Sequence, residues 1–287
     1  MLGGSGWSFP AVSAVNAAVL FVVFTGVFAA GQARQRHRYV DATWGSAFAV
    51  VAVVTLVLSG GGDTQHWDTV RRVLLVVCTV VWGVRLSVHI AWRGRGAPED
   101  PRYAAMLARA GGNPTWAAYS RVYLLQAALV WFISLPVQVG IFVSGHPVAG
   151  AVPVVTLMVV GLGLWLVGVG FEGIGDWQLA RFKADPANRG RLMTAGLWRY
   201  TRHPNYFGDA CVWWGLFLIA VSTWPAALTI ASPVVMTWLL TSGSGKPLVE
   251  ARLSAARPGY ADYVARTSGF IPRRPRRPDP RHRQDVG

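Results

Sequence analysis

Seven predominantly apolar stretches divide the chain, most of them close to the roughly 20 residues that a helix needs to cross a bilayer. They run over residues 11–30, 42–59, 70–92, 122–143, 149–171, 206–222 and 225–241. The pattern predicts an all-α integral membrane bundle of about seven transmembrane helices. The last two stretches are short and meet at Trp224 and Pro225, so one re-entrant hairpin is an alternative.

The charged residues are few and unevenly placed. Only 14% of the 287 residues are charged, yet the net charge is +14. The Lys and Arg residues gather after the first, third, fifth and last stretches, whereas the loops at 143–149 and 222–225 have none. By the positive-inside rule, this alternation predicts an outside N-terminus and a cytosolic C-terminus. It also argues against a nucleic-acid partner and favours membrane lipids and a polyanionic ligand.

Composition gives the expected compartment and domain plan. Arg outnumbers Lys 25 to 2, which suggests a bacterial genome and a multi-pass protein of the inner (plasma) membrane. We expect one membrane domain over residues 1–271, with the cofactor-binding half at about 149–271, and a disordered basic tail over 272–287. Cys78 and Cys211 lie inside predicted spans, so neither a disulfide nor a metal site is expected.

Ionisable residues inside the predicted spans are candidates for function, because a charge in the bilayer is costly. Arg85 lies in the third span, while Glu172 and Asp176 are four residues apart at the inner end of the fifth. One interpretation is an ion pair that locks the bundle, from Arg85 to Glu172 or Asp176. The other is a polar cavity that opens to the cytosol and receives the ribose and amide groups of a ligand.

The most informative segment is residues 190–215, in which Arg199, Arg202 and His203 precede Pro204 and an apolar helix. Proline suits the first turn of a helix, where its missing N–H is harmless. The free N–H groups and the positive dipole end of that helix would face the same side as the basic residues, which favours diphosphate binding. We expect Gly208 to let a ligand approach this helix. Gly173 and Gly175 in the fifth span are open to either ligand approach or helix packing.

Residues 196–209 resemble the C-terminal signature of the steroid 5-alpha-reductase-like membrane proteins. That superfamily includes sterol reductases and isoprenylcysteine-type methyltransferases. Similar segments cover nearly the whole chain: 41–48 (DATWGSAF), 82–95, 99–103 (EDPRY), 126–136, 176–182 (DWQLARF) and 258–272.

The resemblance implies a seven-span bundle that binds NADPH from the cytosol and transfers a hydride to the activated C=C of a lipophilic enone, such as a 3-oxo-steroid or another lipid. Asp41 or Tyr103 would assist the developing enolate. The tyrosine that contacts the enone in steroid reductases has no secure counterpart, because Trp82 stands near the expected turn. The implied cofactor-binding residues are Arg93, Arg95, Glu172, Asp176, Arg181, Tyr200, Arg202, His203, Asn205, Tyr206, Asp209, Glu250, Tyr260 and Tyr263.

Two other function classes fit parts of the same pattern. An S-adenosylmethionine-dependent methyltransferase acting on a lipid or prenylated substrate would share the Arg-His-Pro turn and the closing Tyr-containing segment. Those enzymes carry paired glutamates before the final amphipathic stretch, whereas here Glu250 is followed by Ala251. A non-enzymatic membrane chaperone or lipid-binding protein is the third class.

Overall fold

The computed structural model describes residues 6–60, 66–96, 99–100, 103, 107, 111–146, 151–243 and 245–276, with the side chains of 151 and 152 left out. These described residues are helical, with turns between the helices and no β-strand. An isolated parallel bridge pairs Thr201 with Ser268. The predicted all-α class is confirmed.

The chain divides into two compact units, and each is described by itself below. The first contains residues 1–162 and 216–232, and the second contains residues 163–215 and 233–287. The single membrane domain remains a prediction.

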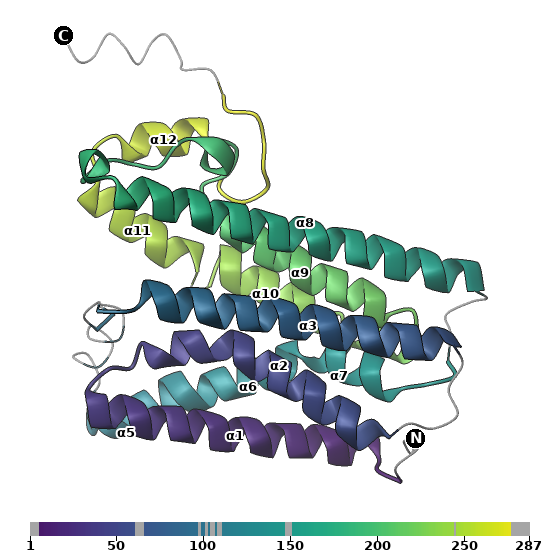
Figure 1. The fold of residues 1–287 in the computed structure, drawn as a ribbon. Helices are drawn as coiled ribbons and strands as arrows, with labels where there is room; N and C mark the ends of the chain where they lie inside the picture. Colours follow the sequence, from purple (N-terminus) through teal and green to yellow (C-terminus); the bar gives the residue numbers. More distant parts are fainter. Residues whose placement is uncertain are drawn as a thin grey trace, which may run out of the picture. The chain divides into compact units, whose positions relative to one another are not determined.

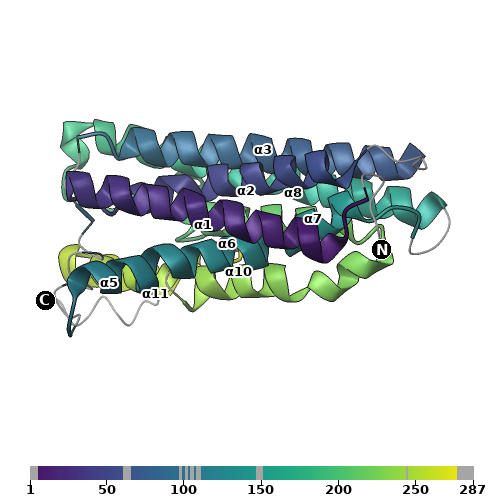
Figure 2. The same cartoon turned by 90° about the horizontal axis from the view of Figure 1, so that it is seen from below.

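The first unit is built on three long helices that lie side by side (Figures 1 and 2). Ser8 precedes the first helix and accepts a hydrogen bond from the amide of Ala11, which caps its N-terminus. A shorter broken helix packs along the first one. The elements are α1 (Phe9–Arg34), α2 (Tyr39–Ser59), α3 (His66–Arg93), α5 (Pro114–Ala118), the π-helix η1 (Tyr119–Leu124), α6 (Leu125–Ile133) and α7 (Leu135–Phe142).

Helices α2 and α3 touch backbone to backbone. A Cβ atom on Gly45 would clash with the carbonyl of Gly83, and a Cβ atom on Gly83 would clash with the carbonyl of Gly45. Beside this contact, the rings of Phe48 and Trp82 pack with centroids 5.8 Å apart. Small residues allow such close crossings in membrane helices. Because of this contact, the first turns of α2 have a defined position in the unit.

The predicted fourth span is broken between α6 and α7, which meet at 43°. Pro136 has no N–H, so the carbonyl of Phe132, four residues earlier, has no partner within the helix. The hydroxyl of Ser232 donates a hydrogen bond to that carbonyl, with 2.8 Å between the oxygens. The break therefore has a local cause and a partner that satisfies the freed carbonyl.

Two buried arginines donate hydrogen bonds to the carbonyls at the C-terminal end of α7. Arg71 Nε donates to the carbonyl of Gly140 at 2.9 Å and Arg72 Nε to that of Ile141 at 2.6 Å. Arg71 also pairs with Asp68 at 2.7 Å. The last carbonyls of a helix have no partner within it, and these guanidinium groups supply one. Their positions next to a span end gave no hint of this role in the sequence.

The second unit holds the C-terminal part of α8, most of α9 and nearly all of α10, followed by two short helices. Two 3₁₀ turns, η2 (Pro186–Asn188) and η3 (Gly196–Arg199), connect α8 to α9, and a third, η4 (Trp224–Thr229), precedes α10. The helices are α8 (Ala151–Ala184), α9 (Pro204–Ala220), α10 (Ala231–Thr241), α11 (Lys246–Ala256) and α12 (Tyr260–Arg266).

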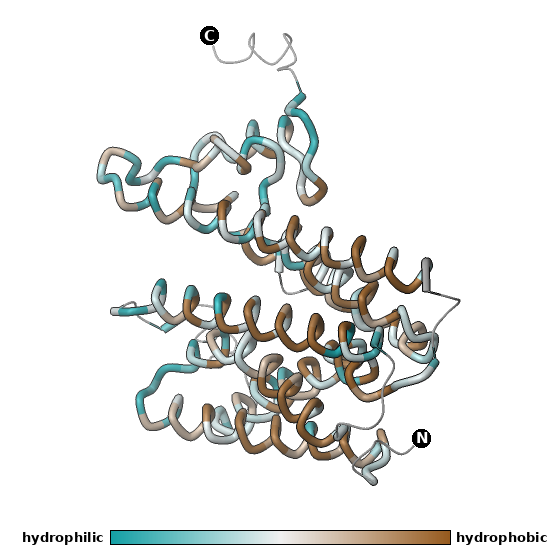
Figure 3. Tube along the Cα trace, turned by 45° about the vertical axis from the view of Figure 1, so that its right-hand side comes forward, coloured by the Kyte–Doolittle hydropathy of each residue, from teal (hydrophilic) through white to brown (hydrophobic). Residues whose placement is uncertain are grey.

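Among the described residues, five helical stretches are long and apolar enough to cross a membrane, or up to six if the bent pair counts as one span. They correspond to α1, α2, α3, residues 153–184 and residues 224–256. Helix α9, at 17 residues, falls just short of the length required. Hydrophobic residues run along these long helices, while the connecting turns are hydrophilic (Figure 3). The integral membrane prediction is confirmed at this level.

Two backbone hydrogen bonds involve residues past the predicted boundary at residue 272. The amide of Arg273 donates to the carbonyl of Tyr200 at 3.0 Å, and the amide of Arg276 to that of Arg266 at 2.9 Å. Residues 272–276, the first of the predicted disordered tail, thus have backbone hydrogen bonds to Tyr200 and Arg266, and the disorder of the tail stays a prediction. The rest of that tail, 277–287, lies outside the described residues.

Gly208 packs against α8, which differs from the expected role in ligand approach. A Cβ atom on Gly208 would lie 2.5 Å from the carbonyl oxygen of Gly168 and 2.9 Å from the amide of Glu172. Gly175 likewise meets Pro204, whereas a Cβ atom on Gly173 would meet nothing within 4 Å. Gly208 and Gly175 therefore serve helix packing, and only Gly173 faces open space.

We expect Gly208→Ala to destabilise the protein by about 1–3 kcal/mol, because the added methyl group forces the α8 and α9 backbones apart. Gly173→Ala is the matched control on α8. It should be neutral or stabilising, since alanine favours a helix by about 1 kcal/mol over glycine. Thermal unfolding in detergent measures both, and equal unfolding temperatures for the two variants would contradict the packing role.

Candidate functional site

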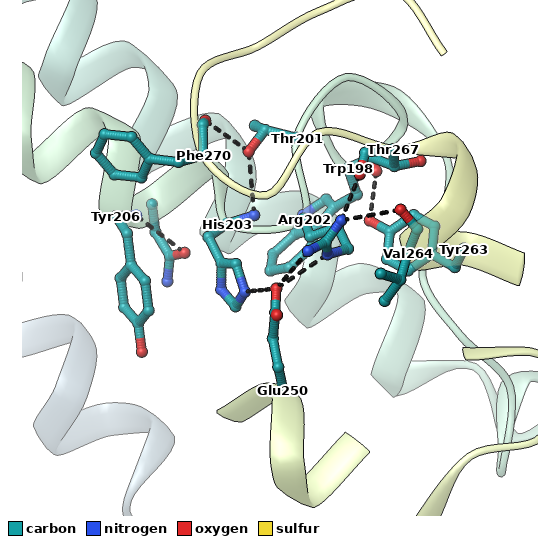
Figure 4. Close-up of polar contacts among 11 residues, drawn as sticks. Trp198, Thr201, Arg202, His203, Tyr206, Glu250, Tyr263, Val264, Thr267 and Phe270 are labelled. Carbon is teal, nitrogen blue, oxygen red and sulfur yellow. Dashed lines mark hydrogen bonds and ion pairs between the residues drawn. The ribbon is translucent and has the colours of Figure 1, made fainter. Parts of the chain in front are cut away.

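The carboxylate of Glu250 accepts hydrogen bonds from two buried side chains of the second unit. Glu250 Oε1 on α11 accepts hydrogen bonds from Arg202 Nε at 2.9 Å and from His203 Nε2 at 3.0 Å (Figure 4). Arg202 Nη2 also lies 2.9 Å from the same oxygen. Arg202 and His203 are buried, so this is a charge-assisted contact in a site with little water.

The segment after α12 is held against the turn that precedes α9. The amide of Arg202 donates to the carbonyl of Ser268 at 2.9 Å, and the Thr201 hydroxyl to that of Phe270 at 2.8 Å. Arg202 Nη1 donates to the carbonyls of Val264 and Thr267. The guanidinium of Arg202 thus bonds to protein acceptors through all three of its nitrogens, so a bond from it to a cofactor would compete with these contacts.

Two tyrosines of α12 line the same centre. Tyr263 donates its hydroxyl proton to the carbonyl of Trp198, and burial raises its pKa above the ordinary value. The Tyr260 hydroxyl is buried and has no hydrogen-bond partner of good geometry among the described residues. Burial raises the pKa of Tyr260, the charge of Glu250 adds to the shift, and the nearby Arg202 opposes it. A buried O–H group of this kind is free to donate to a ligand.

His203 is held in a defined orientation. Its ring stacks on that of Tyr206, with centroids 5.1 Å apart and planes within 3°. Because Glu250 Oε1 only accepts, His203 Nε2 carries the proton. Burial lowers the pKa of His203, while the hydrogen bond and charge of Glu250 act in the opposite direction. Neutral His203 is therefore the form that the fold favours.

The lowered pKa of His203 gives an expected pH dependence. The unfolded state, in which histidine titrates near about 6.5, binds the proton more readily than the folded state. This contribution to stability is therefore complete above about pH 6.5 and is lost as the pH falls below it. We expect the unfolding temperature to drop between about pH 7.5 and about pH 5.5, with a smaller drop in His203→Gln.

His66, which is exposed at the start of α3, provides the control for that experiment. His66→Gln should keep the wild-type dependence of the unfolding temperature on pH. If His203→Gln also kept it, the buried histidine would not be its source.

Other predicted cofactor residues lie along α8 and at the end of the 3₁₀ turn η3. Glu172 and Asp176 are buried, while Arg181 is exposed and its guanidinium lies 5.7 Å from the Trp177 ring. Trp198 Nε1 donates to the carbonyl of Gly175 at 3.0 Å, which fixes η3 against this part of α8. Tyr200, at the end of that turn, is 42% exposed and available to a ligand.

The remaining predicted cofactor residues are less closely grouped. Asn205 and Asp209 are half-buried on α9, in the second unit. Arg93 and Arg95 are exposed at the end of α3, in the first unit, and so are described apart from the others.

The two candidate catalytic residues come together in the first unit. The Tyr103 hydroxyl donates to Asp41 Oδ1 with 2.6 Å between the oxygens. Asp41 lies in the first turn of α2 and Tyr103 follows the 99–100 turn, whose Asp100 carbonyl accepts from the Tyr103 amide at 3.0 Å. Tyr103 is 8% exposed. A phenol held in this way can protonate a substrate oxygen once its O–H turns away from the carboxylate.

A second pair beside it was missed in the sequence. His37 Nδ1 lies 3.0 Å from the Tyr123 hydroxyl, and the backbone amide of His37 donates to Glu99 Oε2. The other oxygen of Glu99 accepts from the Asp100 amide at 2.7 Å. The spacing of His37 and Asp41, four residues apart, was the available signal. Tyr123 gave none, because it comes from a segment distant in sequence.

The described residues contain no group of three or more His, Cys, Asp or Glu side chains that could hold a metal ion. Donors available to a cofactor in the second unit include the exposed Arg181, Arg199 and Tyr200 and the buried hydroxyl of Tyr260. With the carboxylates of Glu172 and Asp176 as acceptors, this set fits the phosphate, ribose and amide groups of a dinucleotide.

The chain matches a family described as "Protein of unknown function (DUF1295)" over residues 27–267. The matched range contains Asp41 and Tyr103 as well as the cluster around Glu250. Neither the curated proteins nor the solved structures give a match.

Proposed function

The chain belongs to the DUF1295 family, and from that premise we propose that it is an NADPH-dependent membrane reductase of steroid 5-alpha-reductase-like type. The reaction is hydride transfer to the activated C=C of a lipophilic enone, either a 3-oxo-steroid or another lipid. The observation that carries the proposal is the 2.6 Å hydrogen bond from Tyr103 to Asp41.

Reduction of an enone needs a proton donor at the carbonyl oxygen while a hydride adds at the β-carbon. Tyr103 is that donor in this proposal. Asp41 positions the phenol by accepting its O–H before the reaction, and the O–H turns from Asp41 Oδ1 to the carbonyl oxygen of the substrate when it donates. The pair lies at the N-terminal end of α2. In this proposal a lipid-soluble substrate reaches it from the membrane.

When bound, NADPH supplies the hydride. In the second unit, Glu172 and Asp176 would accept hydrogen bonds from its ribose and carboxamide groups, while Arg181, Tyr200 and Tyr260 would bind its phosphates. Arg202, His203, Glu250 and Tyr263 hold the α12 segment in place around these ligands. NADPH is favoured over NADH because the 2′-phosphate needs cationic partners, and the basic residues of this unit provide them.

The proposed topology places this basic region in the cytosol, where NADPH is available. Seven crossings with the N-terminus outside are part of the proposal, and the sixth is the 17-residue α9. The membrane is the bacterial inner membrane.

Thermal unfolding of the detergent-solubilised protein tests the cofactor. NADPH at about 100 times its dissociation constant should add about 2.7 kcal/mol of stability by mass action, and NADH should add less at the same concentration. Asp176→Asn should fold normally and bind NADPH about tenfold or more weakly, because it loses one charged acceptor. Equal stabilisation by NADPH and NADH would argue against the 2′-phosphate contacts.

The same experiment separates the alternative functions. S-adenosylmethionine is the third ligand to be tested. The reason is that Arg202 and His203 belong to the Arg-His-Pro turn that the methyltransferase branch shares. Stabilisation by S-adenosylmethionine alone would assign the chain to a methyltransferase. Stabilisation by none of the three would favour the non-enzymatic class. If Asp176→Asn melted much earlier without ligand yet kept its NADPH affinity, Asp176 would be a structural ion-pair partner.

A further inference from the structure

We propose that the side chain of Lys246 binds a phosphate group of the dinucleotide, at a site that it forms with Arg202 and Gly269. This inference rests on the proposed reductase function, because that function supplies the ligand. Lys246 does not belong to the cofactor-binding set derived from the sequence. All three residues lie in the second unit.

Two cationic groups lie beside Gly269. A Cβ atom on this glycine would be 2.7 Å from Lys246 Nζ and 3.1 Å from Arg202 Nη2. Both nitrogens therefore lie within 3.1 Å of the same point, and residue 269 does not occupy that point because it has no side chain. An ammonium and a guanidinium group this close together attract the same anion.

The charges of this group do not balance. Glu250 Oε1 accepts hydrogen bonds from Arg202 at 2.9 Å and from His203 at 3.0 Å (Figure 4). This carboxylate compensates the charge of Arg202. Among the residues that the structure describes, Lys246 Nζ has neither an ion pair nor a hydrogen bond. With His203 neutral, the charges of Lys246, Arg202 and Glu250 leave one positive charge, which an anionic ligand can compensate.

The start of α11 holds Lys246 within reach of a ligand. Lys246 is the first residue of this helix and is half-buried. The amide of Gly245 donates to the carbonyl of Leu239 at 3.0 Å, which fixes the start of α11 against the end of α10. No side chain caps this helix end, so the positive end of the helix dipole adds to the charge of the ammonium group.

The backbone around Gly269 is fixed on both sides. The carbonyl of Ser268 accepts from the Arg202 amide at 2.9 Å, and the carbonyl of Phe270 accepts from the Thr201 hydroxyl at 2.8 Å. Gly269 therefore stays next to the guanidinium of Arg202. Because these contacts exist without a ligand, little ordering of this backbone is needed when a phosphate binds.

Lys246 and Arg202 have different parts in this site. The nitrogens of Arg202 already bond to protein acceptors, so Arg202 mainly contributes its charge. Lys246 contributes the hydrogen bond, because an ammonium group has three donors and binds a phosphate as a point charge. NADPH and NADH share a diphosphate, whereas only NADPH carries a 2′-phosphate, and the two cofactors therefore distinguish the possible sources of the phosphate.

Calorimetric titration of the full-length protein in detergent with NADPH and with NADH is the first test. Lys246→Gln should weaken NADPH binding about tenfold or more, because one charge-assisted hydrogen bond is lost. An equal loss for NADH would assign the diphosphate to Lys246, and an unchanged NADH affinity would assign the 2′-phosphate. Arg252→Gln removes an exposed cation from the same helix and is the matched control, which should keep both affinities.

Thermal unfolding separates ligand binding from a structural role. Without ligand, Lys246→Gln should unfold at the wild-type temperature or slightly above it, because it removes one of two neighbouring like charges. Gly269→Ala keeps every charge but places a methyl group against Lys246 Nζ, so it should also weaken NADPH binding. A lower unfolding temperature in Lys246→Gln together with wild-type NADPH affinity would make Lys246 a structural residue and overturn the inference.

Inorganic pyrophosphate distinguishes failure of this inference from failure of the proposed function. If NADPH stabilises wild type and Lys246→Gln equally, the reductase proposal stands and the role of Lys246 is wrong. If pyrophosphate but not NADPH stabilises wild type, and Lys246→Gln loses that effect, the reductase proposal fails and the phosphate site stands. If neither ligand raises the unfolding temperature of wild type, both proposals are wrong.

Discussion

Tyr103→Phe should reduce the turnover number about 10²- to 10⁴-fold while leaving NADPH binding intact. The variant keeps the ring that fills the space beside α2 but removes the O–H that donates to Asp41 at 2.6 Å. Without a donor at the carbonyl oxygen, the enolate must develop its charge unassisted, and general acid catalysis commonly contributes a factor of this size. Single-turnover oxidation of NADPH, monitored at the nicotinamide absorption band, measures the chemical step directly.

Asp41→Asn separates positioning from proton donation. Asparagine retains an acceptor oxygen for the Tyr103 hydroxyl, so we expect a smaller loss than in Tyr103→Phe. Tyr119→Phe removes another phenol of the first unit, one that bonds to Thr25, and should retain activity. Full activity in Tyr103→Phe would exclude this phenol as the acid and move the search to other donors of the first unit.

Glu250→Ala should lower the free energy of unfolding by about 3–5 kcal/mol, because it leaves the buried guanidinium of Arg202 without its counter-charge. Arg202 is 8% exposed and Glu250 20% exposed at the side chain, so solvent replaces little of the lost interaction. His203 loses its acceptor as well. For a chain of this size we expect the unfolding temperature to fall by about 10 °C.

Two variants sharpen that experiment. Glu250→Gln keeps an oxygen for Arg202 and His203 but loses the charge, so its unfolding temperature should lie between those of wild type and Glu250→Ala. Asp262→Ala removes an exposed carboxylate from the neighbouring α12 and should change the unfolding temperature little. A loss in Glu250→Ala no greater than that in Asp262→Ala would show that the cluster around Glu250 does not hold the α12 segment.

Much of the fold follows from the sequence. Apolar stretches long enough for a bilayer must become helices there, because backbone groups find no other partners, and α1, α2, α3 and α8 lie where that argument places them. The start of α9 at Pro204 follows from the missing N–H of proline.

The finer placement depended on contacts between distant segments. Hydropathy gave no sign that α6 and α7 would bend, because the bend depends on Pro136 together with the hydroxyl of Ser232, 100 residues away from the carbonyl it binds. Gly208 looked available to a ligand in the sequence and proved to be covered by Gly168. The hydrogen bonds from the amides of Arg273 and Arg276 to the carbonyls of Tyr200 and Arg266 likewise had no signal in the composition of that segment.

For the candidate site, the sequence alone determined the membrane helices, the basic turn before Pro204 and the identities of Asp41, Tyr103 and Glu250 as residues of interest. Local patterns suffice for these, since helix formation and charge depend on neighbouring residues. Only the tertiary structure decided that Tyr103 bonds to Asp41, that Glu250 binds both Arg202 and His203, and that His37 meets Tyr123. Each of those contacts joins residues 47 to 86 positions apart, and no local preference of the chain specifies such a pairing.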